Sequence, residues 1–428
     1  MRTLYTWLFR AAVPLILLRL WWRGRAQPEY RKRWRERFGR VPERASRAPL
    51  VWVHAVSVGE TLAAVPMIEK LAVRHPHWQW LVTTSTPTGS ERARAVLQPM
   101  IGGRLLHYYA PYDLPECIAP FVGALRPDTL VIMETELWPN LLAHCAQRGI
   151  PTLLANARLS EKSAAGYARF GRLARPMLRK LDRVVAQYPA DAQRFVELGL
   201  PAERVVASGN IKFDLQIGLG LESEAQVLAH QWRGRRGRPV WLAASTHAGE
   251  EEIVLDAFER MLEDFPDLLL VLVPRHPQRF DSVARLCRSR NLTLLRRSDD
   301  GLPGPTHQVL LGDTMGELLR FYGACDLAFV GGSLVPVGGH NMIEPAAWGV
   351  PVVCGPHLHN FSTVAQLLID AGGMRVVEDA EQLADQLMDW LRDDCGRRSA
   401  GERGREVAAE NSGALERLVE EIDSLMKG

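Results

Sequence analysis

Short apolar runs alternate with amphipathic stretches along most of this 428-residue chain. Runs of about four to eight apolar residues are typical of strands buried on both faces of a parallel sheet, and apolar residues three and four positions apart indicate helices. The first set of predicted strands covers residues 50–55, 80–84, 129–133, 151–155 and 183–186. The pattern restarts with predicted strands at residues 240–244, 268–273, 292–295, 308–311, 327–330 and 351–354.

Strands that alternate with helices predict an α/β protein with doubly wound parallel sheets. Two sets in tandem predict two Rossmann-like domains that face a central cleft, where loops from the carboxyl ends of both sets of strands meet. The chain length of 428 residues agrees with two domains, because one hydrophobic core rarely extends beyond about 250–300 residues. The expected divisions are an N-terminal arm over 1–47, a first domain over 48–207, a second domain over 208–400 and a closing helix over 401–428.

The N-terminal arm is apolar at first and basic afterwards. Residues 4–22 are apolar except for Arg10 and Arg19, and residues 1–47 carry 13 Lys and Arg against 3 acidic residues. The other 381 residues carry 39 Lys and Arg against 46 Asp and Glu, so the excess of positive charge is confined to the arm. This favours an arm that binds a membrane surface and excludes a nucleic-acid surface that extends over the whole chain. The two arginines leave a spanning helix and a shallow insertion both open.

The residues that flank this apolar stretch predict whether it is cleaved and on which side of the membrane the rest of the chain lies. The stretch ends in Arg-Leu-Trp-Trp-Arg instead of small residues, so a cleaved signal peptide is not expected. Basic residues after the stretch predict an inner-membrane anchor with the globular part on the cytoplasmic side. The six cysteines are widely spaced and no Asp-x-Asp motif is evident, so we expect reduced packing thiols, no metal and no cofactor.

Acidic residues follow two of the predicted strands in the first domain. Glu60 stands after His54-Ala55-Val56-Ser57-Val58-Gly59, where a helix N-terminus favours a carboxylate that can act as a general base. The simpler interpretation is a first-turn Glu that stabilises its helix. Glu134 and Glu136 follow the strand at 129–133, and Lys212 lies in the segment that joins the domains, where it is expected near the cleft.

The most specific signal is in the second domain, where two glycine pairs, Gly331-Gly332 and Gly338-Gly339, follow the strand at 327–330. Paired glycines let backbone N–H groups approach a phosphate, and Glu344, at the start of the next helix, is placed to bind ribose hydroxyls. The spacing differs from G-x-G-x-x-G, so a nicotinamide cofactor is not expected. Nearby, Arg275 and the segment Met315-Gly316-Glu317 are further candidates for binding a nucleotide.

Taken together, these motifs resemble those of the 3-deoxy-D-manno-octulosonic acid (Kdo) transferases of Gram-negative bacteria, a family of membrane-attached inverting glycosyltransferases. The resemblance runs over nearly the whole chain. The matching segments are the N-terminal arm and residues 54–60, 83–89, 133–140, 156–160, 209–214, 244–247, 274–277, 312–317 and 338–345.

The resemblance implies the two-domain GT-B fold and transfer of Kdo from CMP-Kdo to a lipid A precursor, lipid IVA, at the inner membrane, with inversion and without a metal. It implies that Glu60 is the general base and that Glu134 and Lys212 stabilise the transition state. The positions that match the CMP-binding segments are Pro274, Arg275, Met315, Gly316, Glu317, Asn341, Met342, Ile343 and Glu344.

Three other functions fit part of the pattern. A GT-B enzyme that uses a UDP-sugar and a lipid acceptor is the nearest, and competition between CMP and UDP separates it. A sugar-nucleotide epimerase has the same architecture, needs no lipid and should work without residues 1–47. A non-catalytic membrane-tethered scaffold would be indifferent to the loss of the Glu60 carboxylate.

Overall fold

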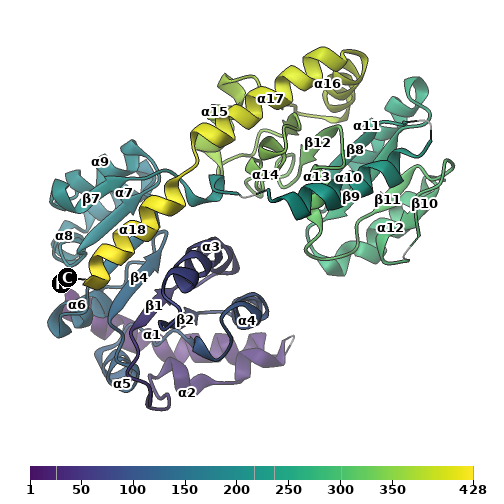
Figure 1. Cartoon of the computed structure of the whole chain (residues 1–428). Coiled ribbons are helices and arrows are strands. Elements are labelled where there is room, and N and C mark those ends of the chain that lie inside the picture. The colour runs from purple at the N-terminus through teal and green to yellow at the C-terminus, as the bar shows by residue number, and fades with distance from the viewer. Residues whose placement is uncertain (26, 216, 236, 300, 428) are drawn as a thin grey trace. The chain divides into compact units, whose positions relative to one another are not determined.

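The chain folds into two compact units, each built on its own sheet. The structure, a computed structural model, describes all residues except 26, 216, 236, 300 and 428. Unit 1 comprises Met1–Asp214 together with Ser412–Gly428, and unit 2 comprises Leu215–Asn411. Each unit contains a parallel sheet of seven strands. Figure 1 labels several strands of each sheet.

The sheet of unit 1 has the strand order β3-β2-β1-β4-β5-β6-β7. Strand β1, inside this sheet, is buried along its whole length, with Val53 opposite Val82 on one side and Val131 on the other. This explains why the central strands read as unbroken apolar runs. The strands are β1 (Leu50–His54), β2 (Gln79–Thr84), β3 (Leu105–Tyr109), β4 (Thr129–Met133), β5 (Thr152–Ala157), β6 (Arg183–Ala186) and β7 (Val205–Ala207).

Helices cover both faces of this sheet. One apolar core joins it to α3, α4 and α18, and the other joins it to α5, α6, α8 and α9. The helical segments of unit 1 are α1 (Arg2–Arg23), η1 (Pro28–Arg31), α2 (Trp34–Arg37), α3 (Val58–Arg74), α4 (Pro87–Ile101), η2 (Gly102–Arg104), α5 (Pro115–Leu125), α6 (Pro139–Arg148), α7 (Glu161–Arg169), α8 (Gly171–Leu178), α9 (Pro189–Glu197), η3 (Ala202–Arg204), η4 (Ile211–Phe213) and α18 (Ala414–Lys427).

Unit 2 repeats the plan, with the strand order β10-β11-β9-β8-β12-β13-β14. The strands are β8 (Val240–Thr246), β9 (Leu269–Pro274), β10 (Leu294–Arg296), β11 (Val309–Leu311), β12 (Leu327–Val330), β13 (Val352–Cys354) and β14 (Met374–Val376). The helical segments are α10 (Leu219–Arg233), α11 (Glu250–Asp264), η5 (Pro277–Arg279), α12 (Phe280–Ser289), η6 (Arg297–Asp299), α13 (Leu318–Tyr322), α14 (Ile343–Ala347), α15 (Ser362–Asp370), α16 (Ala380–Arg392) and α17 (Asp394–Glu410).

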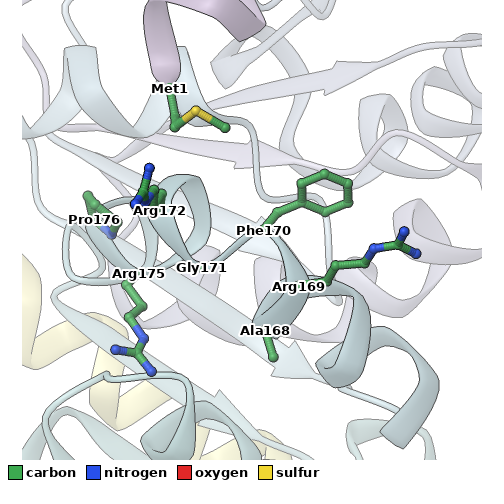
Figure 2. Close-up of a pocket in the computed structure, with 8 residues that line it drawn as sticks. All are labelled: Met1, Ala168, Arg169, Phe170, Gly171, Arg172, Arg175 and Pro176. Atoms are coloured by element: carbon green, nitrogen blue, oxygen red, sulfur yellow. The ribbon is translucent and has the colours of Figure 1, made fainter.

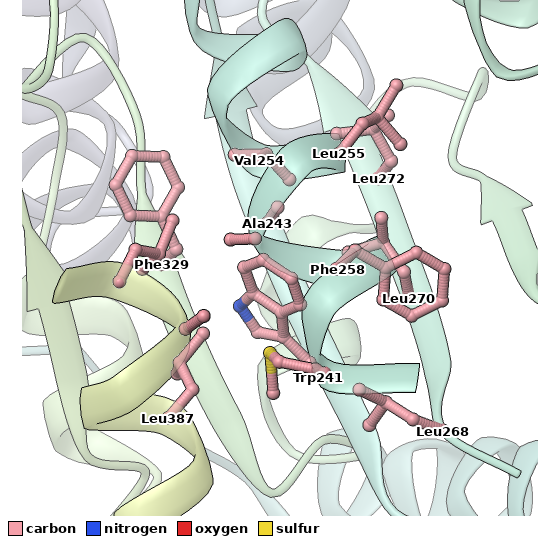
Figure 3. Close-up of a cluster of buried hydrophobic side chains, with 14 of the residues drawn as sticks. Trp241, Ala243, Val254, Leu255, Phe258, Leu268, Leu270, Leu272, Phe329 and Leu387 are labelled. Carbon is pink, nitrogen blue, oxygen red and sulfur yellow. The ribbon is translucent and has the colours of Figure 1, made fainter. Parts of the chain in front are cut away.

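The largest apolar core of unit 2 lies between its sheet and helices α11, α12 and α16. Figure 3 shows Trp241 of β8 among these side chains, with Phe258 of α11 and Leu387 of α16 close by. All three are fully buried. A second core on the other face of the sheet contains Trp232 of α10 and Phe321 of α13, whose rings meet edge to face.

The strand order places one reversal point in each sheet. In unit 1 the chain moves outward from β1 to β3, then returns to β4 and moves outward the other way. In unit 2 the same reversal separates β8 from β12. Loops that leave the carboxyl ends of these neighbouring strands turn in opposite directions, which leaves a crevice where ligands bind in open α/β sheets.

The three strands that the sequence pattern did not predict are β3, β7 and β14, and each lies at an edge of its sheet. An edge strand needs less apolar surface than a central strand. Only one residue of β14 is fully buried and none of β7 is. Strands β7 and β14 therefore lack the continuous apolar run on which the prediction depends.

The boundaries of the units differ from the predicted divisions at residues 207 and 400. The segment 208–214 belongs to unit 1, because Ile211 lies in its core and Asp214 accepts hydrogen bonds from the backbone N–H groups of Gly413 and Leu415. The single closing helix is also wrong. Two helices, α17 and α18, are separated at Gly413, whose φ of +86° ends the helical geometry.

The N-terminal helix α1 presents apolar side chains on two opposite faces. One face packs on unit 1, where Val13 meets Tyr112 and Thr6 is hydrogen-bonded to Asn140. The opposite face carries apolar side chains at helical spacing that remain exposed, namely Leu4, Trp7, Leu8, Leu15, Leu18 and Trp22. Among the described residues, α1 is the one helix long and apolar enough to cross a membrane by length and composition.

Candidate active site

Glu60 lies at the reversal point of unit 1, in the first turn of the helix that follows β1. Ser57 begins the helix, and its hydroxyl accepts a hydrogen bond from the Glu60 backbone N–H while donating to Glu60 Oε1 at 2.8 Å. The Val56 N–H donates to Glu60 Oε2, also at 2.8 Å. The local sequence Ser-x-x-Glu thus forms a reciprocal cap that fixes the carboxyl group, so the helix-stabilising interpretation of Glu60 is correct as far as it goes.

The surroundings of this carboxyl group tune it towards proton transfer as well. Glu60 is 8% exposed, and burial raises the pKa of Glu60 to about 7. The hydrogen bonds from Ser57 and Val56 lower that pKa, while the nearby carboxylates of Glu136 and Glu134 raise it. A base with a pKa near the working pH takes up and releases a proton most effectively, so this environment is compatible with the general-base role predicted for Glu60.

Glu134 and Lys212 lie at the same reversal point. Glu134 follows β4, the neighbour of β1, and its backbone has a φ of +56°. A non-glycine residue in this region is strained, and such strain is common where a side chain has to be aimed for function. Lys212 in η4 places its Nζ 3.2 Å from Glu134 Oε1. The structure therefore brings Glu134 and Lys212 together, and Glu134 acts on the pKa of Glu60.

His54, which ends β1 close to this group, does not serve as a base. It is fully buried, its Nδ1 lies 2.9 Å from Thr83 Oγ1, and its ring packs edge-on against Trp138. Burial lowers the pKa of His54 to about 3, so the ring stays neutral at physiological pH. His54 is part of the packing that supports the turn to Glu60.

Glu250, at the start of α11, occupies the corresponding turn of unit 2. Its carboxylate is fully buried and accepts hydrogen bonds from backbone N–H groups of the loop after β12, at 2.7 Å from Gly332 and 2.9 Å from both Ser333 and Leu334. The His247 N–H supplies a fourth bond at 2.9 Å. Sequence reasoning missed this role, because Glu250 begins an acidic run that looks like ordinary first-turn charge.

The two glycine pairs after β12 use their backbone N–H groups within the chain. Gly331 donates to Ala244 O, Gly332 donates to Glu250, and both Gly338 and Gly339 donate to Gly332 O. The approach of these N–H groups to a phosphate stays a prediction, and in this structure each of them has an acceptor within the chain. The glycines are needed for close approach, since a Cβ on Gly331 would come within 2.6 Å of Ser245 O.

The other predicted nucleotide-binding positions fall into two groups, those with exposed side chains and those with buried side chains. Arg275 and Met315 are exposed beyond β9 and β11, whereas Pro274 ends β9 in a buried position. The Met342 and Ile343 side chains are fully buried, so only their backbone atoms are available to a ligand.

Glu317 and Glu344, the two acidic residues among the predicted nucleotide-binding positions, have different partners. Glu317 is bound to Arg297 at 3.0 Å and to Arg320 at 2.7 Å, so its carboxylate is occupied and only its backbone can contact a nucleotide. Glu344 Oε1 accepts a hydrogen bond from Asn341 Nδ2 at 3.0 Å. Burial raises the pKa of Glu344, against the effects of Asn341 and Arg275. Asn341 thus orients a carboxyl group suited to hydroxyl recognition.

A separate hollow of about 550 Å³ opens on unit 1, away from the predicted site residues. Figure 2 shows Met1, the Phe170 ring and the arginines at the junction of α7 and α8 around it. Its basic lining is Arg169, Arg172 and Arg175. Among the described residues no group of three or more His, Cys, Asp or Glu side chains is placed to hold a metal ion.

Sequence comparison places this geometry in a family. Residues 32–215 match the family model described as 3-deoxy-D-manno-octulosonic-acid transferase (kdotransferase). A 3-deoxy-D-manno-octulosonic acid transferase from Haemophilus influenzae is 41% identical over 98% of this chain and 97% of its own. This chain belongs to the Kdo transferase family. A transferase of the same description from Bordetella pertussis is 38% identical over 99% of both chains.

This Kdo transferase also has structural neighbours with other activities. A UDP-GlcNAc 2-epimerase from Neisseria meningitidis, solved with UDP-GlcNAc bound, covers 89% of this chain and 100% of its own with a TM-score of 0.58. At 14% identity this likeness supports the GT-B fold, as expected from the sequence, and says nothing about the reaction. The family assignment makes this Kdo transferase a glycosyltransferase of lipopolysaccharide biosynthesis.

The buried Glu250 carboxylate yields a stability prediction. Glu250→Ala leaves four backbone N–H groups without their acceptor, and each buried orphan donor costs about 1–3 kcal/mol. We expect the free energy of unfolding of unit 2 to fall by at least about 3 kcal/mol, measured by urea denaturation followed through tryptophan fluorescence. Glu252→Ala, on the exposed side of the same turn, is the control and should change it by less than about 0.5 kcal/mol. Equal effects of the two substitutions would contradict this role.

Proposed function

We propose that this Kdo transferase transfers Kdo from CMP-Kdo to lipid IVA with inversion of the anomeric centre, on the cytoplasmic side of the inner membrane. The observation that carries the proposal is the buried Glu60 carboxyl group, with its pKa of about 7, beside the Glu134–Lys212 pair at the reversal point of unit 1. Family membership supplies the transferred sugar, and this group supplies the chemistry that the transfer needs.

In the proposed reaction Glu60 removes the proton from a sugar hydroxyl of the acceptor. The oxygen attacks the anomeric carbon of Kdo from the face opposite CMP, a new C–O bond forms, and the bond to the CMP phosphate oxygen breaks. One proton therefore ends on Glu60 and one electron pair ends on the phosphate. Because attack and departure occur on opposite faces, one displacement inverts the anomeric centre.

The charges that develop in this step match the other residues of the site. Positive charge grows on the sugar ring, and the Glu134 carboxylate is the group that offsets it; negative charge grows on the phosphate, and Lys212 is the cation that offsets it. The 3.2 Å contact between these two side chains keeps both in place before substrate arrives. The mechanism uses side chains of this chain and no metal ion.

The nucleotide is assigned to unit 2. Arg275 is exposed at the end of β9, where its guanidinium can pair with a phosphate or stack on a base. Glu344, oriented by Asn341, is assigned to the ribose hydroxyls. Pro274, Met315, Gly316, Glu317, Met342 and Ile343 would shape the site through backbone atoms or, for Met315, through its exposed side chain.

We further propose that α1 anchors the protein in the plane of the membrane interface. Its contacts with unit 1, including the ion pair between Arg10 and Glu116 at 2.7 Å, occupy one face of the helix. A helix held along a folded unit cannot at the same time be surrounded by lipid as a spanning helix is. The exposed face that includes Trp7 and Trp22 suits a shallow insertion, and the arginines around the hollow complement the phosphates of a lipid acceptor.

Replacing the proposed base tests the function. Glu60→Gln keeps the size of the side chain but removes the proton acceptor, so transfer of labelled Kdo from CMP-Kdo to lipid IVA should slow by at least about a hundredfold in kcat. Glu69→Gln, exposed on the same helix, is the matched control and should retain wild-type kcat. A wild-type protein that transfers no Kdo, and binds UDP in preference to CMP, would refute the donor assignment.

The pKa of Glu60 predicts the acid limb of the rate profile. A base must be deprotonated, so kcat/KM should fall about tenfold per pH unit below a midpoint near 7 and level off above it. The Ser57 hydroxyl lowers the pKa of Glu60 by donating to the carboxylate, so Ser57→Ala should move the midpoint to higher pH. If the midpoint of the acid limb were the same in Ser57→Ala as in wild type, the group that titrates would be one other than Glu60.

The exposed face of α1 predicts the mode of membrane binding. Acidic substitutions at two positions, Leu8→Glu with Leu15→Glu, should abolish most co-sedimentation with vesicles of phosphatidylethanolamine and phosphatidylglycerol, because two charges would enter the acyl region. The control pair Leu219→Glu with Val227→Glu changes equally exposed apolar residues on α10 and should bind as wild type does. Undiminished binding of the α1 variant would contradict this mode of insertion.

A further inference from the structure

Two histidines meet at the reversal point of unit 2. His247 follows β8 and His340 lies in the loop after β12, the two neighbouring strands from which the chain turns in opposite directions. Their imidazole rings are stacked, with ring centroids 5.0 Å apart and planes 8° apart, and their Nε2 atoms are 2.7 Å apart. Both side chains are partly exposed, so a ligand in the crevice can reach them.

The glycine loop is shaped around the His340 ring. Gly332 has a φ of +68°, and a Cβ at this position would come within 3.0 Å of His340 Cδ2. The Gly338 and Gly339 N–H groups both donate to Gly332 O, which closes the loop immediately before His340. Glu250 holds the other end of the loop through Gly332, Ser333 and Leu334. The geometry of the loop therefore sets the position of one imidazole against the other.

The surroundings of the two rings favour an anion. Arg275 and Arg279 lie on the adjacent segment after β9, and His276 packs edge-on against His247 at 5.2 Å. Of the carboxylates near the rings, Glu250 already accepts four backbone hydrogen bonds, and the buried Glu251 is paired with Arg279 at 2.8 Å. Burial is the largest cause lowering the pKa of both His247 and His340, and Arg275 and His276 lower it further, while Glu250 raises the pKa of His247. Each ring is therefore neutral and has one N–H to donate.

At 2.7 Å, the His247 and His340 Nε2 atoms are at hydrogen-bond distance from each other. One nitrogen must carry the proton and the other must accept it, so the pair as it stands contains one N–H donor at the contact. An incoming phosphate offers further acceptor oxygens. For both Nε2 atoms to donate to it, the second imidazole must carry its single proton on Nε2 instead of Nδ1, and the phosphate oxygens then replace the contact between the two nitrogens. The backbone N–H groups of the glycine pairs already donate within the chain.

We propose that His247 and His340 together bind the phosphate of the nucleotide donor, each donating an Nε2–H to a phosphate oxygen. The inference rests on the proposed function, since it assumes that unit 2 holds a cytidine nucleotide, and it adds the two residues that recognise the phosphate. It also gives the glycine pairs after β12 their purpose, which is to set the His340 ring in place.

The test compares CMP with cytidine, which lacks the phosphate, as ligands of the full-length protein in detergent. Calorimetry measures CMP affinity, and competition against CMP measures cytidine affinity. The variants are His247→Asn, His340→Asn and His340→Phe, the last of which keeps a ring against Gly332. His230→Asn, exposed on α10, is the control. Thermal unfolding identifies any variant that no longer folds, and the Phe variant then carries the comparison.

The proposal predicts that each variant binds CMP at least about tenfold more weakly while cytidine affinity stays within about twofold, and that the control binds both ligands as wild type does. Unchanged CMP affinity in folded variants would overturn the proposal, and so would an equal loss of CMP and cytidine affinity, since that pattern marks a structural role. If the wild-type protein bound no CMP, the proposed function itself would fail, and this inference with it.

Discussion

A carboxyl group buried at the end of a parallel strand must be surrounded by hydrogen-bond donors, and the number of donors decides what it can do. An ionised carboxylate has about four acceptor positions. Glu250 accepts four backbone N–H groups from two segments, so its capacity is filled and it holds the loop after β12 in place. Glu60, in the equivalent turn of unit 1, accepts hydrogen bonds from Ser57 and Val56 alone among the residues that the structure describes, so it keeps capacity to take up a proton.

This difference between Glu60 and Glu250 follows from the residues that come after the neighbouring strand at each reversal point. In unit 2 the strand beside β8 is followed by a glycine-rich loop that wraps around Glu250 with its backbone. In unit 1 the strand beside β1 is followed by Glu134, whose strained backbone directs a second carboxylate to the site and raises the pKa of Glu60. One fold plan therefore yields a structural anchor in one unit and, on our proposal, the acid–base group in the other.

Much of this architecture could be predicted from the sequence, because central strands buried on both faces must be apolar throughout. The edge strands β7 and β14 could not, since they bury too little to leave a pattern. Glu60, Glu134 and Lys212 were predicted. The proximity of Glu60 and Glu134 follows from the adjacency of β1 and β4, whereas Lys212 reaches Glu134 from the segment after the edge strand β7. The role of Glu250 and the contact between His247 and His340 were missed, because both depend on residues 82 or more positions apart in sequence.

The central claim is that chemistry and nucleotide binding belong to different units of the chain. Titration of CMP into Glu60→Gln and Arg275→Ala, each as the full-length protein, tests it most directly. The account predicts that Glu60→Gln binds CMP within about twofold of wild type although its transfer activity is lost, whereas Arg275→Ala binds CMP at least about tenfold more weakly. Loss of CMP affinity in Glu60→Gln, with wild-type affinity in Arg275→Ala, would contradict it.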